Sequence, residues 1–342
     1  MTGVFIDAAM DLIQVPAPNR QTAIKGLIDA QEIAFSYGLT TVDDAGLEQA
    51  TIELIDSLQQ KDKLKIRMYA MVSATQKNLD YYLNKGIVKT DRLHVRSFKI
   101  YGDGALGSRG AAMRKSYSDR HNHFGALIYS PERYREMAKQ IAASEYQMNT
   151  HAIGDSANTW ILKTYEEFLK GEQNRRWRIE HAQIISKNDF SLFKNVLPSI
   201  QPTHATSDMY WAEDRIWNDR MKGAYAYKDL LNVYGKVALG TDFPVEQVNP
   251  FLTFYAAAVR KDTKGYPEGG FQIENVLSRE ETLKGMTIWA AFSNFEENEK
   301  GSIEVGKLAD FVILNQDIMT IEENMIPKTK ATATYISGEK VY

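Results

Sequence analysis

The chain alternates short apolar runs with helical patterns, and this alternation constrains its fold more than any other feature. Neighbouring parallel strands need a long crossover connection, usually a helix, so regular alternation predicts a parallel α/β sheet. We expect helices over residues 22–37, 47–60, 131–145 and 156–170, the third with Ser130 as N-cap and Pro131 in its first turn. We expect strands over residues 39–42, 66–72, 95–101, 147–151, 177–181, 197–201 and 236–240.

These strands predict an incomplete barrel. A chain of 342 residues suits a single TIM (β/α)8-type barrel, which closes with eight strands. The residues before Thr22 do not supply another strand, because 3–12 has a helical or irregular pattern, and the turn composition of 43–46 ends the first predicted strand at Val42. We therefore expect strands 2–8 of a barrel over residues 1–300. The unpaired edges beside the missing strand predict self-association, as in a homo-oligomer, or a complementing segment.

The last forty or so residues have a different character. Residues 303–314 and 331–342 are short β-like runs, and the second contains the turn residues Ser337 and Gly338. We expect residues 301–342 to form the remnant of a small β-sandwich domain at the C-terminus.

Composition excludes several classes of function. The 41 Lys and Arg residues nearly balance the 44 Asp and Glu residues, and without a basic stripe a nucleic-acid partner is not expected. No apolar run is long enough to span a bilayer, so no membrane partner is expected either. Cysteine is absent, which leaves histidine, carboxylate or modified lysine to bind any metal.

Polar residues recur where the predicted strands end. They are Lys99, His151, His181, His204 and Asp242. The carboxyl ends of parallel barrel strands meet on one face, where catalytic residues lie. Each residue alone has an ordinary explanation, such as a core histidine or a helix-capping aspartate. Their occurrence on successive strands instead favours a divalent metal bound by nitrogen and oxygen, and hydrolysis with a carboxylate moving protons.

Two other motifs invite different interpretations. Residues 102–107 match the Gly-x-Gly-x-x-Gly pattern of dinucleotide sites, but Arg109 and the residues after it do not open a clear helix, and no acidic partner follows. His121 and His123 have the spacing of a metal-binding pair, but they lie in a polar stretch that is typical of a loop.

Several segments resemble the amidohydrolase superfamily, and most closely its amidohydrolase-3, YtcJ-like branch. They are residues 98–110 (FKIYGDGALGSRG), 150–155 (THAIGD), 179–183 (IEHAQ), 201–208 (QPTHATSD), 240–246 (GTDFPVE) and 300–314 (KGSIEVGKLADFVIL). The resemblance implies a TIM barrel with a small β-sandwich and a site for one or two divalent metal ions, commonly zinc. It also implies a small-molecule substrate.

The resemblance implies a role for each matching residue. Lys99 corresponds to a lysine that is carboxylated and bridges two metals, and His151 and His181 bind one of them. Asp242 binds the other metal and acts as general base and acid. His204 lies near the substrate carbonyl as a catalytic and substrate-binding residue.

Asp103 and Arg109, on the glycine-rich loop, are expected to bind substrate. The implied activity is hydrolysis of carbon–nitrogen bonds other than peptide bonds, in amides or cyclic amides. The family carries a His-x-His pair on its first strand, which none of the six histidines here supplies. The alternative is therefore a catalytically inactive fragment or a regulatory, binding protein of the same family. The first twenty residues lack a signal-peptide pattern, which predicts a cytoplasmic protein, or an exported protein or lipoprotein if a segment precedes Met1.

Overall fold

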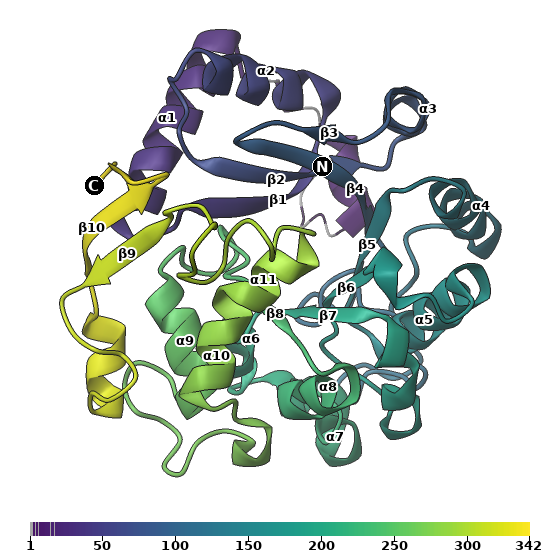
Figure 1. Ribbon diagram of the computed structural model, residues 1–342. Coiled ribbons are helices and arrows are strands. Elements are labelled where there is room, and N and C mark those ends of the chain that lie inside the picture. Colours follow the sequence, from purple (N-terminus) through teal and green to yellow (C-terminus); the bar gives the residue numbers. More distant parts are fainter. Residues whose placement is uncertain (1–2, 4, 6, 14, 17) are drawn as a thin grey trace.

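The computed structural model describes residues 3, 5, 7–13, 15–16 and 18–342, and it is built around a curled parallel sheet (Figure 1). The strands follow one another in the order β1 (Thr41–Leu47), β2 (Arg67–Ser73), β4 (Leu93–Tyr101), β5 (Gln147–Ala152), β6 (Arg178–His181), β7 (Leu197–Ile200) and β8 (Ala238–Leu239). The short strand β3 (Val88–Lys89), which the pattern did not predict, pairs antiparallel with β4. Among the described residues β1 and β8 are not paired with each other, so the sheet is an open TIM-type barrel, as predicted.

Helices connect the strands and cover the outside of the sheet (Figure 1). They are α1 (Arg20–Ser36), α2 (Gln49–Gln60), α3 (Gln76–Lys85), α4 (Pro131–Ala142), α5 (Asp155–Leu169), α6 (Thr203–Asp208), α7 (Ala212–Met221), α8 (Tyr227–Tyr234), α9 (Pro250–Val259), α10 (Arg279–Met286) and α11 (Ile288–Ser293). The predicted cap of α4 is confirmed, because the Ser130 hydroxyl accepts a hydrogen bond from the amide of Arg133 at 3.2 Å. Short 3-10 helices η1 (Asp7–Leu12), η2 (Gln173–Arg175), η3 (Lys187–Asn195), η4 (Ile273–Asn275) and η5 (Glu323–Lys328) occupy some of the loops.

The predicted end of the first strand, at Val42, is wrong. Residues 43–46 do not form a turn but continue β1 to Leu47, in parallel register with β2. The Asp43 carboxylate accepts hydrogen bonds from Arg178 on β6 and Asn294 after α11, at 3.2 and 2.7 Å. These partners, distant in the sequence, let an aspartate occupy a strand where its local preference favours a turn.

A small antiparallel sheet follows the barrel, as the pattern of the C-terminal residues predicts. It contains β9 (Phe311–Leu314), β10 (Ala331–Ile336) and β11 (Glu339–Lys340), with β10 in the middle. The sheet lies beside α1 (Figure 1), where the Thr334 hydroxyl donates to the carbonyl of Phe35 at 2.7 Å. A buried ion pair between Arg67 and Asp310, at 2.6 Å, also joins it to β2.

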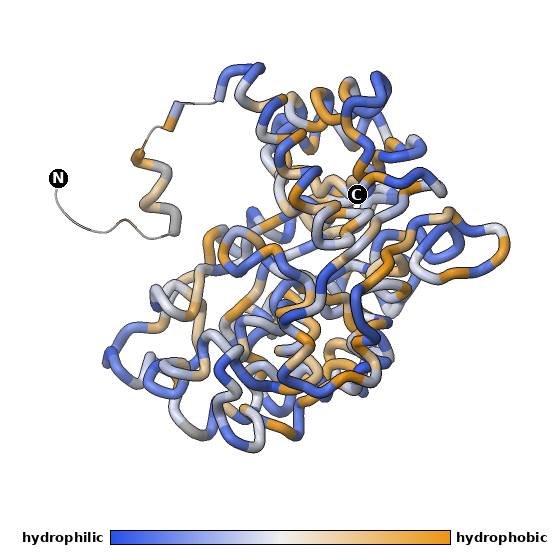
Figure 2. The backbone as a smooth tube through the Cα atoms, turned by 90° about the vertical axis from the view of Figure 1, so that its left-hand side faces the viewer, coloured by the Kyte–Doolittle hydropathy of each residue, from blue (hydrophilic) through white to orange (hydrophobic). Residues whose placement is uncertain are grey.

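The N-terminal 3-10 helix η1 stands apart from the rest of the chain (Figure 2). The side chains of Met10 and Leu12 are exposed to solvent there. Across the residues that the structure describes, no helix combines the length and the apolar character needed to cross a bilayer.

A buried charged cluster around Glu296 makes the free energy of unfolding depend on pH. The Glu296 carboxylate contacts His94 of β4 at 3.2 Å and forms ion pairs of 2.6 Å with Lys89 and Lys300. Burial favours the neutral acid, but the contacts with His94 and the lysines outweigh it and hold the pKa of Glu296 well below its usual value near 4.5. Burial also lowers the pKa of His94.

Both shifts predict the same response to acid. In acid the folded state binds fewer protons than the unfolded state. The free energy of unfolding is therefore highest at neutral pH and falls as the pH drops below about 6, through His94, and then below 4.5, through Glu296. The free energy of unfolding from urea denaturation should therefore decrease over this range. Glu296→Gln should flatten the lower part of the decrease, whereas Glu299→Gln, at a half-exposed carboxylate that also pairs with Lys89, should not. Parallel curves for the two variants would refute this role of Glu296.

Candidate active site

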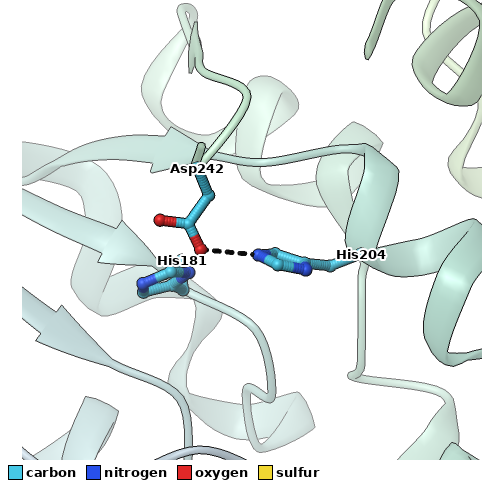
Figure 3. Close-up of side chains that lie close together, drawn as sticks. All are labelled: His181, His204 and Asp242. Carbon is cyan, nitrogen blue, oxygen red and sulfur yellow. Dashed lines mark hydrogen bonds and ion pairs between the residues drawn. The ribbon is translucent and has the colours of Figure 1, made fainter. Parts of the chain in front are cut away.

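Three of the predicted residues form a cluster at the carboxyl ends of the strands. His181 ends β6, His204 lies in α6 just after β7, and Asp242 follows β8. One ligand atom from each lies within 4.8 Å of the others. In Figure 3 the Asp242 carboxylate points toward both rings, and its Oδ2 lies 2.9 Å from His204 Nε2. This arrangement of two imidazoles and a carboxylate suits a divalent metal ion.

The backbone is strained at two of these three positions. His181 has a φ of 73° and Asp242 a φ of 60°, both in the left-handed region that residues other than glycine seldom adopt. Such conformations cost of order 1–3 kcal/mol each and persist only where the surrounding structure imposes them. They turn the chain sharply where each strand ends, and the side chains remain directed into the cluster.

The other two predicted residues lie on the adjacent strands. His151 is on β5, and its ring centre is 4.6 Å from that of His181. Lys99 is on β4, buried, with its ammonium nitrogen 4.8 Å from the ring centre of Tyr101. The register between β4 and β5 pairs Tyr101 with His151, and their ring centres are 5.7 Å apart. The structure thus brings all five strand-end residues to one end of the sheet.

Burial makes two of the histidines suitable as metal ligands. It lowers the pKa of His151 to about 3 and holds that of His181 well below its usual value, so both rings are neutral at pH 7. Within the described part of the chain, His181 Nδ1 and His151 Nε2 have no hydrogen-bond partner, and the nearest carboxylate oxygen to the latter, on Asp103, is 3.7 Å away. Buried nitrogen atoms with a free lone pair are the donors that a metal needs, so these residues fit one.

His204 and Lys99 have different electrostatic surroundings. Burial disfavours the imidazolium form of His204, but the hydrogen bond to Asp242 and the ion-pair contact with Glu246 outweigh it and raise the pKa of His204 to about 9. Burial lowers the pKa of Lys99 to about 8, against the opposing effect of Glu180 and Asp242. These surroundings favour the imidazolium form of His204 in the metal-free protein, and burial favours the neutral amine of Lys99.

The two residues of the glycine-rich loop make other contacts. The buried Asp103 carboxylate accepts hydrogen bonds of 2.8 to 3.0 Å from the amides of Ala112, Ile153 and Gly154. Arg109 forms two hydrogen bonds with Asp119, at 3.0 and 2.8 Å. Neither belongs to the three-residue cluster, and their binding of substrate stays a prediction.

The two alternative motifs, residues 102–107 and the pair His121 and His123, lie in loops. Leu106 to Arg109 form a turn, and no helix begins there among the described residues, so the structural context of a dinucleotide fingerprint is absent. The ring of His123 contacts the carbonyl of Arg109 at 2.8 Å through Nε2, and His121 is exposed. Both histidines lie in loop structure, as predicted.

One residue that contacts the cluster was not predicted. Glu246 Oε1 lies 3.3 Å from His204 Nδ1, on the opposite side of the ring from Asp242. The available signal was its position four residues after Asp242, with Pro244 between them marking a tight turn that brings the two residues together. A cavity of about 220 Å³ adjoins this carboxylate and is also lined by Thr203, Ser207 and Tyr210.

Comparison with known proteins gives matches over nearly the whole chain. Residues 3–342 match the sequence profile of a family described as the amidohydrolase family. The protein LONG AFTER FAR-RED 3 of Arabidopsis thaliana is 32% identical over 365 residues, which cover all of this chain and 61% of that protein. The putative amidohydrolase YtcJ of Bacillus subtilis is 26% identical over 350 residues, covering all of this chain and 66% of its own length. The chain therefore spans less than two thirds of the length of these relatives.

A third relative and two solved structures extend the comparison. The N-substituted formamide deformylase of Arthrobacter pascens is 20% identical over 98% of this chain and 64% of its own length. The structures are uncharacterized metal-dependent hydrolases of Pyrococcus horikoshii and Pyrococcus furiosus, each 26% identical, with TM-scores of 0.81 and 0.80. They cover 94% and 91% of this chain, and 68% and 64% of their own chains.

Proposed function

The chain belongs to the amidohydrolase family, and from this premise we propose that it acts as a metal-dependent hydrolase of carbon–nitrogen bonds other than peptide bonds. The observation that carries the proposal is the convergence of His181, His204 and Asp242 within 4.8 Å at the carboxyl ends of the strands. The name of the Arthrobacter relative, a deformylase of N-substituted formamides, supports amides as a class of small-molecule substrate. We propose cyclic amides beside them.

We assign the metal ligands to the buried strand-end residues. His151 and His181 would hold one ion through neutral imidazole nitrogens, and Asp242 would supply an oxygen for a second. A donor set of nitrogen and oxygen without sulfur is compatible with zinc. A divalent ion held there supplies Lewis acidity, which polarises a carbonyl group and lowers the pKa of water.

Lys99 would contribute to the same site after carboxylation. The neutral amine adds to carbon dioxide, forms a carbamate and releases a proton, so a cation becomes an anionic oxygen ligand. The pKa of Lys99, lowered by burial to about 8, keeps a usable fraction of the side chain in the reactive neutral form.

Asp242 and His204 would carry the proton transfers. The Asp242 carboxylate accepts a proton from the attacking water and delivers it to the leaving nitrogen. The 2.9 Å contact with His204 Nε2 holds the carboxylate in a fixed orientation. The positive charge of the His204 imidazolium would stabilise negative charge that develops on the substrate carbonyl oxygen. Asp103 and Arg109 would shape the pocket around the substrate.

Removal of the metal tests the proposal. We expect dialysis against a chelator to reduce hydrolysis of a panel of N-substituted formamides and cyclic amides to background, and zinc to restore it. Chelator saturated with zinc beforehand is the control for effects of the chelator itself. A protein that retains full hydrolysis without metal would contradict the metal-dependent mechanism, and one that binds no metal and hydrolyses nothing would support an inactive or regulatory role.

A further inference from the structure

We propose that Glu246 is a positioning residue, which holds the ring of His204 through Nδ1 so that Nε2 faces Asp242. The inference rests on the proposed function, because it assigns a role within the same site. Glu246 Oε1 lies 3.3 Å from Nδ1, and Asp242 Oδ2 lies 2.9 Å from Nε2. The ring is therefore held on both sides, and Figure 3 shows the Nε2 side directed at Asp242.

Asp242 and Glu246 belong to the same turn of the chain. The amide of Glu246 donates to the carbonyl of Asp242 at 3.2 Å, which closes a single turn after β8. This turn places one carboxylate on each side of His204, because the ring projects from α6 into the space between them. The side chain of His204 is 11% exposed and that of Glu246 is 17% exposed, so water competes little for their contact.

A further residue fixes Glu246 itself. The Ser207 hydroxyl, one turn after His204 on α6, donates to Glu246 Oε1 at 2.5 Å. The same carboxylate oxygen thus joins the helix and the turn after β8. A histidine that acts on a metal or substrate through one nitrogen commonly donates its other N–H to a carboxylate, which sets the tautomer and the ring orientation. In this chain the Glu246 carboxylate lies 3.3 Å from Nδ1 of His204 as an ion-pair contact, on the side of the ring where such a partner is expected.

The test begins with the metal-free protein. With histidine-selective ¹⁵N labelling, the six histidines give few ring signals, and His204→Gln assigns those of His204. We expect a slowly exchanging Nδ1–H signal in the unsubstituted chain. Glu246→Ala should abolish the slow exchange, and Glu246→Gln should preserve it because the amide oxygen still accepts. The exposed Glu268→Gln, outside the site, is the matched control and should change nothing.

Kinetics on the zinc-loaded protein complete the test. Glu246→Ala should lower kcat about 10- to 100-fold, the range seen when outer partners of active-site histidines are removed, with KM almost unchanged. Glu246→Gln should recover most of the loss. An unchanged Nδ1–H signal and unchanged kcat in Glu246→Ala would overturn the proposal. If the unsubstituted chain shows no hydrolysis, the proposed function fails, and the ring signal alone decides the role of Glu246.

Discussion

Asp242→Asn is expected to lower kcat for hydrolysis about 10³-fold, within the range that general acid–base groups contribute. The amide has nearly the shape of the carboxylate and can still accept a hydrogen bond from His204 Nε2. It cannot take a proton from water or return one to the leaving nitrogen. Zinc binding through His151 and His181 should persist, whereas the second ion should bind more weakly because its oxygen ligand has lost its charge.

The measurement is steady-state kinetics together with zinc titration of the same preparation. Asp80→Asn, an identical substitution at an exposed residue on α3, is the control and should retain full activity. Turnover in Asp242→Asn equal to that of the unsubstituted chain would remove Asp242 from the proton transfers. Loss of both zinc binding and turnover would assign it a role in binding the metal only.

Arg178→Met is expected to lower the free energy of unfolding by about 3–5 kcal/mol, the cost of leaving buried charges without their partner. Arg178 is fully buried inside the barrel and contacts Asp43 at 3.2 Å, Glu180 at 2.9 Å and the hydroxyl of Ser293 at 2.9 Å. Its removal leaves two buried carboxylates without their cationic partner. The side-chain contacts that join β6 to β1 and to the end of α11 are also lost.

Urea denaturation compares this variant with Arg135→Met, which breaks the exposed pair of Arg135 with Glu167. Exposed pairs contribute about 0–1 kcal/mol, so the control should lose little. Adding Asp43→Asn and Glu180→Gln to Arg178→Met should restore part of the stability, since the two unpaired buried carboxylates are then removed. Equal losses in the two single variants would show that Arg178 contributes no more than a surface arginine.

The outcome at β1 shows where prediction from sequence was limited. The apolar runs predicted six of the seven strands of the curled sheet closely, because burial on both faces leaves a continuous local pattern. Asp43 interrupts this pattern, and its local preference favours a turn. Its partner Arg178 lies 135 residues later, so no local feature could show that a strand continues through it. The two-residue strand β3 was missed because it is too short to leave a pattern.

The same distinction holds at the candidate site. The order of residues along each strand predicts which side chains lie at the strand ends, because position along a strand is a local property and parallel strands all end on one face. Which of these side chains touch depends on the three-dimensional packing of the chain. It placed Asp242 and Glu246 on either side of His204 and turned Asp103 toward three backbone amides. These contacts depend on sheet register and on the paths of loops, which are set by packing between elements far apart in the chain.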